Sequence, residues 1–238
     1  DSHMPSVMDF PVEEAIRQAL EKDGKQWGEG LTRVYDAVAM DYLYGDVNNI
    51  LLMLGNHDMD RIADVVMDQD PRRVKIAYTL LATMRGIPQV FYGDEYAMKS
   101  ADRRMGHSTL RMPLPLGEAV TAEMQDMFDY QSRLFQWRKG EKVIHTGRTM
   151  HFMSRDNTYA YFRYNDEEAV FVFVNASDAD RTIPTAHYAE ILGKYKPVGV
   201  DVISGKTYDL SQKDITIEPL SSIVVKLKKK KKRRLHKK

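Results

Sequence analysis

Residues 50–95 decide the fold, and they read ILLMLGNHDMDRIADVVMDQDPRRVKIAYTLLATMRGIPQVFYGDE. Two short apolar runs, residues 50–54 and 87–92, flank a longer segment in which apolar residues recur at helical spacing. A run of five apolar residues is typical of a strand that is buried on both faces. The segment therefore predicts a strand, a helix and a second strand, which is the repeating unit of a parallel sheet.

The helix between the two strands has clear sequence signals at both ends. Asp70 can accept hydrogen bonds from the free amides of the first turn, and Pro71 suits the first helical position, where its missing N–H costs nothing. Gly86 suits a left-handed residue after the last turn. The buried face of the helix is predicted to hold Val74, Ala77, Leu81 and Met84.

The sequence on either side continues the alternation of strands and helices, and after residue 140 the spacing of its apolar residues changes. Residues 6–10 are predicted to form a strand, and helical stripes follow over residues 11–20, 31–42 and 119–139. From residue 141 the apolar period becomes two, which is typical of antiparallel strands. The strands expected there cover residues 159–164, 169–174, 199–202, 206–210, 215–217 and 223–227, the first two as a hairpin.

The predicted organisation is therefore an α/β domain over residues 1–140, an antiparallel β domain over residues 141–227 and a disordered basic tail over residues 228–238. The tail holds nine of the 35 Lys and Arg residues, so 26 basic residues remain in the rest of the chain against 34 acidic ones. This acidic body argues against a nucleic-acid-binding surface. The tail itself is open to three interpretations: an engineered or frame-shifted end, a solvated segment, or a polyanion-binding segment.

Composition excludes several classes of protein. The chain is 43% hydrophobic and 29% charged, which is ordinary globular usage and excludes disorder throughout. No apolar run approaches the roughly 18 residues that a membrane helix needs, so we expect no membrane partner. There is no cysteine, which excludes disulfides, thiolate metal sites and cysteine nucleophiles. No pattern typical of a secretion signal is seen near the first residue, and the compartment stays open.

Two polar clusters follow the predicted parallel strands at the points where these strands end. Asn56, His57 and Asp58 follow the first strand, and Asp94 and Glu95 follow the second. Ligands of parallel βα folds meet the loops that leave the carboxyl ends of the strands. A histidine beside a carboxylate can hydrogen-bond a polar ligand while the acid stabilises developing positive charge. By spacing alone, a turn followed by a helix cap explains this pair equally well.

The order LGNHD, amphipathic helix and GIPQVFYGDE resembles the α-amylase family of glycoside hydrolases, near the seventh and eighth strands of its (β/α)8 barrel. Residues 7–11 (VMDFP) resemble the sixth strand of the neopullulanase and cyclomaltodextrinase branch, and the β domain resembles the family's domain C. The resemblance covers residues 5–227. It implies an α/β plus all-β fold, in which the last three βα units of a (β/α)8 TIM barrel precede an antiparallel β-sandwich.

The resemblance also implies roles for five residues. Asp58 matches the family's third catalytic carboxylate, which stabilises the transition state at the sugar of subsite −1, and His57 matches the histidine that hydrogen-bonds the same sugar. Asn56, Arg61 and Arg111 are expected to contact the substrate. The sequence after Arg111, MPLP, departs from the family's acidic and Gly-Gly-Trp pattern, which puts sugar contacts from that loop in doubt.

The family's nucleophile and acid/base are not found in this sequence. Retaining hydrolysis needs two carboxylates about 5 Å apart, and the Gly-x-Arg-x-Asp pattern that carries the family's nucleophile does not occur here. Asp94 and Glu95 match a segment that shapes the barrel rim and do not replace the missing pair. For the parent enzyme the resemblance implies retaining hydrolysis of α-1,4-linked, or also α-1,6-linked, glucans. We expect this chain alone to be inactive.

The expected partner is an α-glucan oligosaccharide, and no nucleic acid is expected. Three βα units cannot close an eight-stranded barrel, so open sheet edges favour self-association or pairing with the missing barrel half. A non-catalytic carbohydrate-binding or interaction protein derived from this fold is the alternative function. No cofactor is evident, and a structural calcium ion stays open as a minor alternative. The acidic residues that invite such a site do not have the spacing of an EF-hand; these residues are Asp58, Asp60, Asp64, Asp68 and Asp70.

Overall fold

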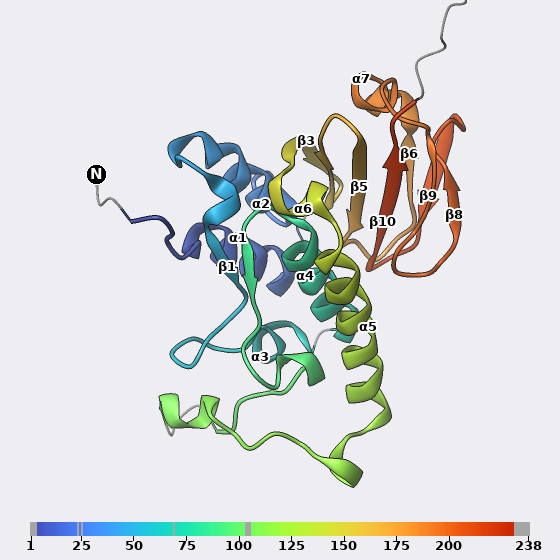
Figure 1. Ribbon diagram of the computed structural model, residues 1–238. Helices are drawn as coiled ribbons and strands as arrows, with labels where there is room; N and C mark the ends of the chain where they lie inside the picture. The colour runs from blue at the N-terminus through green and yellow to red at the C-terminus, as the bar shows by residue number, and fades with distance from the viewer. Residues whose placement is uncertain (1–3, 23, 25, 69, 103–105, 231–238) are drawn as a thin grey trace, which may run out of the picture.

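The computed structural model of the chain describes residues 4–22, 24, 26–68, 70–102 and 106–230. An α/β part and a β part lie side by side, and the long helix α5 runs along the first of them (Figure 1). The α/β part contains helices α1 (Phe10–Glu21), α2 (Leu31–Ala39), α3 (Ile62–Val66), α4 (Pro71–Thr83) and α5 (Ala122–Lys139) and strands β1 (Leu51–Met53) and β2 (Ile87–Gln89). After α6 (Lys142–Thr146), the β part contains β3 (Arg148–Arg155), β4 (Thr158–Tyr164), β5 (Glu168–Asn175), β6 (Arg181–Pro184), α7 (Ala189–Leu192), β7 (Val198–Val200), β8 (Thr207–Asp209), β9 (Asp214–Ile217) and β10 (Ser221–Lys228).

Strands β1 and β2 run parallel, as the sequence predicts, with Leu51 opposite Ile87. The strand predicted over residues 6–10 is much shorter, because Asp9 is already the N-cap of α1. Only Met8 forms a bridge, parallel to Leu51. The parallel segments therefore follow the order Met8, β1 and β2, and the described residues form an incomplete sheet and no closed barrel.

The signals that the sequence shows at both ends of α4 are confirmed. Asp70 Oδ1 accepts a hydrogen bond from the amide of Arg72 at 2.9 Å. Gly86 has a φ of +97°, and a Cβ at this position would lie 2.6 Å from the carbonyl oxygen of Ile50, so no larger residue fits there. Arg138 of α5 donates a hydrogen bond to the carbonyl oxygen of Gly86 at 2.6 Å. This fixed turn places β2 directly beside β1.

The antiparallel β region predicted after residue 141 is confirmed. Its central sheet has the strand order β10-β5-β4-β3, and two further pairs, β6–β9 and β7–β8, complete it. Along β5 the side chains alternate between the two faces: Val170 and Val172 pack into the core that contains the helices, whereas Phe171 and Phe173 pack against the smaller strands. The α/β part and the β part therefore share one hydrophobic core across the predicted boundary at residue 140.

The beginning of the predicted basic tail belongs to the sheet. Lys228 is the last residue of β10, and Lys229 forms a bridge with Tyr195. The rest of the tail, residues 231–238, lies outside the described residues. Among the helices in the described part of the chain, none combines the length and the apolar character needed to cross a membrane.

Helix α2 and the β3–β4 hairpin share the main hydrophobic core and are also joined by a hydrogen-bonding side chain and a ring pair. Asn157 lies in the two-residue turn of the hairpin at a φ of +56°, and its Oδ1 accepts a hydrogen bond from the amide of Leu31 at 3.0 Å. This bond satisfies one of the free amides at the start of α2. Beside it, the rings of Tyr35 and His151 stack with centroids 4.7 Å apart. Burial at this junction lowers the pKa of His151.

The titration of His151 gives the junction a measurable pH dependence. The unfolded chain takes up a proton on this residue near pH 6.5, whereas the folded chain does so only at lower pH, so the free energy of unfolding should rise with pH up to about 6.5. We expect His151→Phe, which preserves the ring pair, to reduce the increase of the unfolding free energy with pH. Urea denaturation at a series of pH values between about 5 and 7 measures this increase. The exposed His187, changed to Phe, is the control. An unchanged slope in His151→Phe contradicts the assignment.

Candidate functional site

The loop that follows β1 carries the predicted Asn-His-Asp cluster on a tight turn. Asn56 and Met59 form a bridge across the turn, and Asn56 Oδ1 accepts a hydrogen bond from the amide of Asp58 at 2.8 Å. Helix α3 begins only at Ile62, so the carboxylate of Asp58 does not cap it. The turn leaves the side chains of His57 and Asp58 58% and 59% exposed. Of the alternative interpretation, the turn is therefore present and the helix cap by Asp58 is not.

Three basic side chains surround the carboxylate of Asp58. His57 Nε2 lies 3.2 Å from Oδ2, while His107 Nδ1 and Arg111 Nη2 lie 3.4 Å and 3.5 Å from Oδ1. The hydrogen bond with His107 lowers the pKa of Asp58 below its usual value, and the charges of His57 and Arg111 act in the same direction. Asp58 is therefore an ionised, solvent-accessible carboxylate at neutral pH, with hydrogen-bond donors on both sides.

His107 is the member of this cluster that the sequence does not predict. It begins the short 3₁₀ helix η5 (His107–Leu110), 49 positions from Asp58, in a polar segment without an apolar period. Arg111, which the sequence does predict, follows η5 and donates a hydrogen bond from Nη1 to the carbonyl oxygen of His107 at 2.9 Å. The two residues therefore approach Asp58 as one unit.

Arg61 lies in the interior, away from this open cluster. Its side chain is fully buried; Nη1 donates to Asp94 Oδ1 at 2.6 Å and to the carbonyl oxygen of Tyr92 at 2.8 Å, and Nη2 donates to the carbonyl oxygen of Leu110 at 2.9 Å. The guanidinium also lies 4.4 Å from the centroid of the Phe91 ring. All of these contacts are internal, so the substrate contact expected of Arg61 does not fit its position.

Asp94 is the buried counter-ion of Arg61. Burial raises the pKa of Asp94 to about 6, and the guanidinium of Arg61 opposes this rise, so both groups are charged at neutral pH. The backbone carbonyl of Asp94 also accepts a hydrogen bond from Gln131 of α5 at 2.8 Å. Through these bonds the pair connects the loops that follow β1 and β2 to the segment that carries His107 and Arg111.

The other aspartates considered for calcium have protein partners. Asp64 accepts hydrogen bonds from the amides of Arg61 at 3.1 Å and Ser100 at 2.7 Å. Asp68 forms an ion pair with Lys99. Within the described ranges, no group of three or more His, Asp or Glu side chains is arranged to hold a metal ion.

Two protein families match the sequence of this chain. The α-amylase catalytic domain matches residues 1–181, and the cyclomaltodextrinase C-terminal domain matches residues 149–226. The first match includes β1, β2 and the Asp58 cluster, and the second includes almost all of the antiparallel strands. The antiparallel strands begin with β3 at Arg148, which is close to residue 149, where the match to the second family begins.

Individual relatives agree with these families. A cyclomaltodextrin glucanotransferase of Geobacillus stearothermophilus is 25% identical over 203 residues, which are 79% of this chain and 26% of the relative. An α-amylase of Niallia circulans is 26% identical over 195 residues, which are 79% of this chain and 34% of the relative. The crystal structure of AmyP in complex with maltose superposes with a TM-score of 0.77 at 18% identity and covers 94% of this chain and 50% of that one, which shows a common fold.

The chain thus spans about a quarter to a third of the length of these curated relatives and about half of the solved structure. More than half of its residues match the catalytic-domain family, and the parallel strands carry the polar loops in the order that the sequence predicts. The chain belongs to the α-amylase family of glycoside hydrolases, with part of the catalytic domain joined to a cyclomaltodextrinase C-terminal domain.

Proposed function

We propose that this chain supplies the sugar-holding side of the active site of a retaining glycoside hydrolase that acts on α-1,4-linked, or also α-1,6-linked, glucans. The observation that carries the proposal is the open Asp58 carboxylate with His57, His107 and Arg111 around it. The family match supports the same chemistry. Maltodextrins, cyclodextrins and pullulan are the substrates that we propose for the whole enzyme.

The Asp58 cluster has the chemistry that a neutral sugar requires. An ionised carboxylate accepts hydrogen bonds from sugar hydroxyls, while imidazole and guanidinium groups donate to their oxygens. The transition state of glycoside hydrolysis resembles an oxocarbenium ion, so a fixed negative charge beside the ring stabilises it more than the ground state. We propose that Asp58 has this role, that His57 and Arg111 orient the same sugar and that His107 holds the Asp58 carboxylate. Asn56 supports the turn through the Asp58 amide.

Bond cleavage needs further groups that we do not assign to this chain. A retaining mechanism uses a nucleophile and an acid/base about 5–5.5 Å apart. The role proposed for Asp58 is neither of these, and Asp94 is engaged in a buried ion pair with Arg61. We therefore propose that the chain of 238 residues by itself binds α-glucans but does not hydrolyse them.

We propose a positioning role for Arg61 in place of the expected substrate contact. Its guanidinium joins Asp94 and the carbonyl oxygen of Leu110, the residue directly before Arg111. We propose that the open cluster around Asp58 depends on this arrangement, because Arg111 directly follows the residue whose carbonyl Arg61 binds. The buried pair would therefore set the distances from Asp58 to both residues.

Calorimetry with maltoheptaose tests the proposed site. We expect saturable binding that His57→Ala weakens about tenfold, because a sugar oxygen loses a hydrogen-bond donor. Tyr42→Ala, a change of an exposed aromatic residue away from the cluster, should leave the affinity unchanged. A reducing-sugar assay of the same preparations should detect no turnover. Binding that does not respond to His57→Ala, or robust sugar release that survives purification, would contradict the proposal.

Substitution of the buried pair tests the positioning role. Asp94→Asn leaves the Arg61 guanidinium without its counter-ion, and breaking a buried pair costs about 3–5 kcal/mol of unfolding free energy. Arg61→Lys retains the charge but loses the forked contact, so we expect weaker maltoheptaose binding in a folded protein. Urea denaturation and calorimetry provide the two readouts, and Glu95→Gln is the neighbouring control. If Arg61→Lys binds maltoheptaose as tightly as the parent chain, Arg61 has no positioning role.

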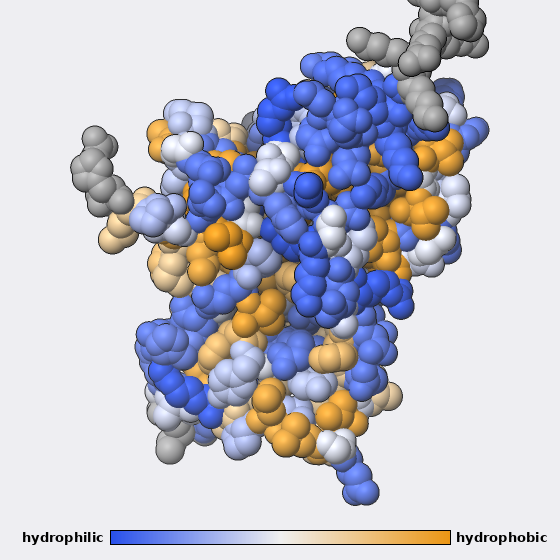
Figure 2. Space-filling model, in the orientation of Figure 1, coloured by the Kyte–Doolittle hydropathy of each residue, from blue (hydrophilic) through white to orange (hydrophobic). Residues whose placement is uncertain are grey.

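Apolar side chains on the parallel segments motivate a proposal about assembly. Val7, Met8, Ile87 and Val90 are 38–49% exposed, and apolar side chains gather on the face of the α/β part that Figure 2 shows. Exposed apolar surface next to open strand edges favours association. We propose that this surface pairs with a second copy of the chain or with the missing part of the barrel.

Light scattering after size-exclusion chromatography tests the pairing. We expect the chain to form dimers or larger species, and Ile87→Lys should shift it towards the monomer because the charge disfavours burial. Val198→Lys is the matched control, since Val198 in β7 and Ile87 are both 49% exposed. A modest interface has a dissociation constant of ~1 μM. A chain that stays monomeric at protein concentrations up to about 100 μM therefore contradicts the proposal.

A further inference from the structure

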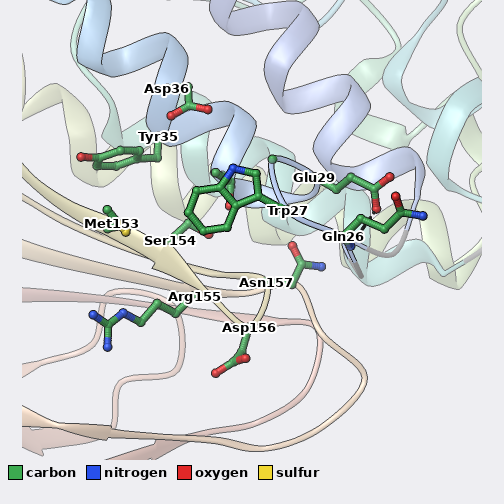
Figure 3. Close-up of a pocket in the computed structure, with 13 residues that line it drawn as sticks. Gln26, Trp27, Glu29, Tyr35, Asp36, Met153, Ser154, Arg155, Asp156 and Asn157 are labelled. Atoms are coloured by element: carbon green, nitrogen blue, oxygen red, sulfur yellow. Dashed lines mark hydrogen bonds between the residues drawn. The ribbon is translucent and has the colours of Figure 1, made fainter.

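Trp27 is the most exposed large apolar side chain in the described part of the chain. Its exposed fraction is 96%, whereas core side chains of this size are normally covered. The residue stands at the edge of a hollow of about 650 Å³, which the loop after α1, helix α2 and the β3–β4 turn enclose. Figure 3 shows the indole ring between Tyr35 and Asp36 of α2 on one side and the hairpin residues on the other.

The hollow has hydrogen-bonding groups that the protein does not use. The hydroxyl of Ser154 is buried, the residue being 8% exposed, and it has no hydrogen-bond partner among the described residues. Asp36, Arg155 and Asp156 also line the hollow, and within the described ranges their side chains make no hydrogen bond or ion pair. An unpartnered buried hydroxyl is unfavourable in a folded protein unless water or a ligand satisfies it.

The walls of the hollow are held by contacts of their own. The amide of Gln26 donates a hydrogen bond to Glu29 Oε2 at 3.1 Å, which closes the loop that presents Trp27. On the opposite wall, Tyr35 is stacked on His151, and Asn157 joins the hairpin turn to α2. The hairpin wall and the loop backbone are therefore fixed before a ligand arrives, whereas the Trp27 ring, which is 96% exposed, is ordered on binding.

We propose that this hollow is a binding site for a glucose unit of an α-glucan, with Trp27 as its stacking platform. An indole ring covers the apolar C–H face of a sugar, and the carboxylates and the guanidinium at the rim accept hydrogen bonds from its hydroxyls and donate to them. The rim carries both signs of charge, which suits a neutral ligand better than a cation. The choice of an α-glucan rests on the proposed function.

The hollow would be a second glucan-binding site on this chain, separate from the Asp58 cluster. None of its lining residues belongs to the Asp58 cluster, which lies on the loop after β1. A smaller hollow of about 230 Å³ on the other side of the hairpin shares Met153, Arg155 and Asp156 with it. A glucan chain of several units can therefore continue past the first sugar along the hairpin.

Tryptophan fluorescence tests the proposal, because the chain has only two tryptophans. In the Trp137→Phe variant Trp27 is the sole emitter, and we expect a saturable fluorescence change when maltoheptaose is added. If Trp137→Phe lowers the melting temperature, the difference between the parent chain and Trp27→Phe isolates the same signal. The absence of a change, or an equal change with cellohexaose or with tetramethylammonium, overturns the assignment.

Affinity electrophoresis through gels that contain amylopectin separates this site from the Asp58 cluster. We expect Trp27→Ala to weaken retardation about tenfold, and Tyr42→Ala, at another exposed aromatic residue, to leave it unchanged. The fluorescence change of Trp27 should persist in His57→Ala, and its loss there would overturn a separate site. Retardation that depends on Trp27 but not on His57 would support this inference and contradict the proposed function of the Asp58 cluster.

Discussion

The buried ion pair between Arg61 and Asp94 is the interaction on which the polar end of the α/β part depends. Two charges removed from water need hydrogen-bond partners, and here both terminal nitrogens of the guanidinium are paired, with a carboxylate and two backbone carbonyls, while Nε has no partner among the described residues. These partners come from two segments, the loop of Tyr92 and Asp94 and the segment of Leu110, and both are distant in sequence from Arg61. The pair therefore fixes three loops, each with little apolar content, relative to one another. As a result Asp58, His107 and Arg111 lie together on one surface.

The features that could be predicted from the sequence are those with local causes. Asp70 and Gly86 fix the ends of α4 through their own backbone geometry, and the Asn56–Asp58 turn follows directly from the end of β1. Arg61 could not be placed in this way, because its burial depends on Asp94 and on a carbonyl 49 positions away. His107 lies in a segment without periodicity, so only the folded chain brings it to Asp58. The strand expected over residues 6–10 shrinks to one bridge because the N-cap of α1 begins inside it.

The central antiparallel sheet explains why the two parts of the chain form one body. Its strands β4, β5 and β10 bury both faces, one against the helices and one against the small strand pairs. A sheet with two covered faces reads as a nearly continuous apolar run in the sequence, and β5 shows this from Ala169 to Val174. The hollow beside Trp27 lies at the junction of the two parts, whereas the site around Asp58 lies on the loops of the α/β part.

The hydrogen bond from Leu31 to Asn157 spans 126 positions of the chain. During synthesis the amide at the start of α2 leaves the ribosome long before the hairpin that satisfies it exists, so this helix cannot reach its final stability until the later segment has emerged. Contacts of such separation slow the search for the native state. A single amide side chain in a two-residue turn thereby links the stability of α2 to a hairpin that is made later in synthesis.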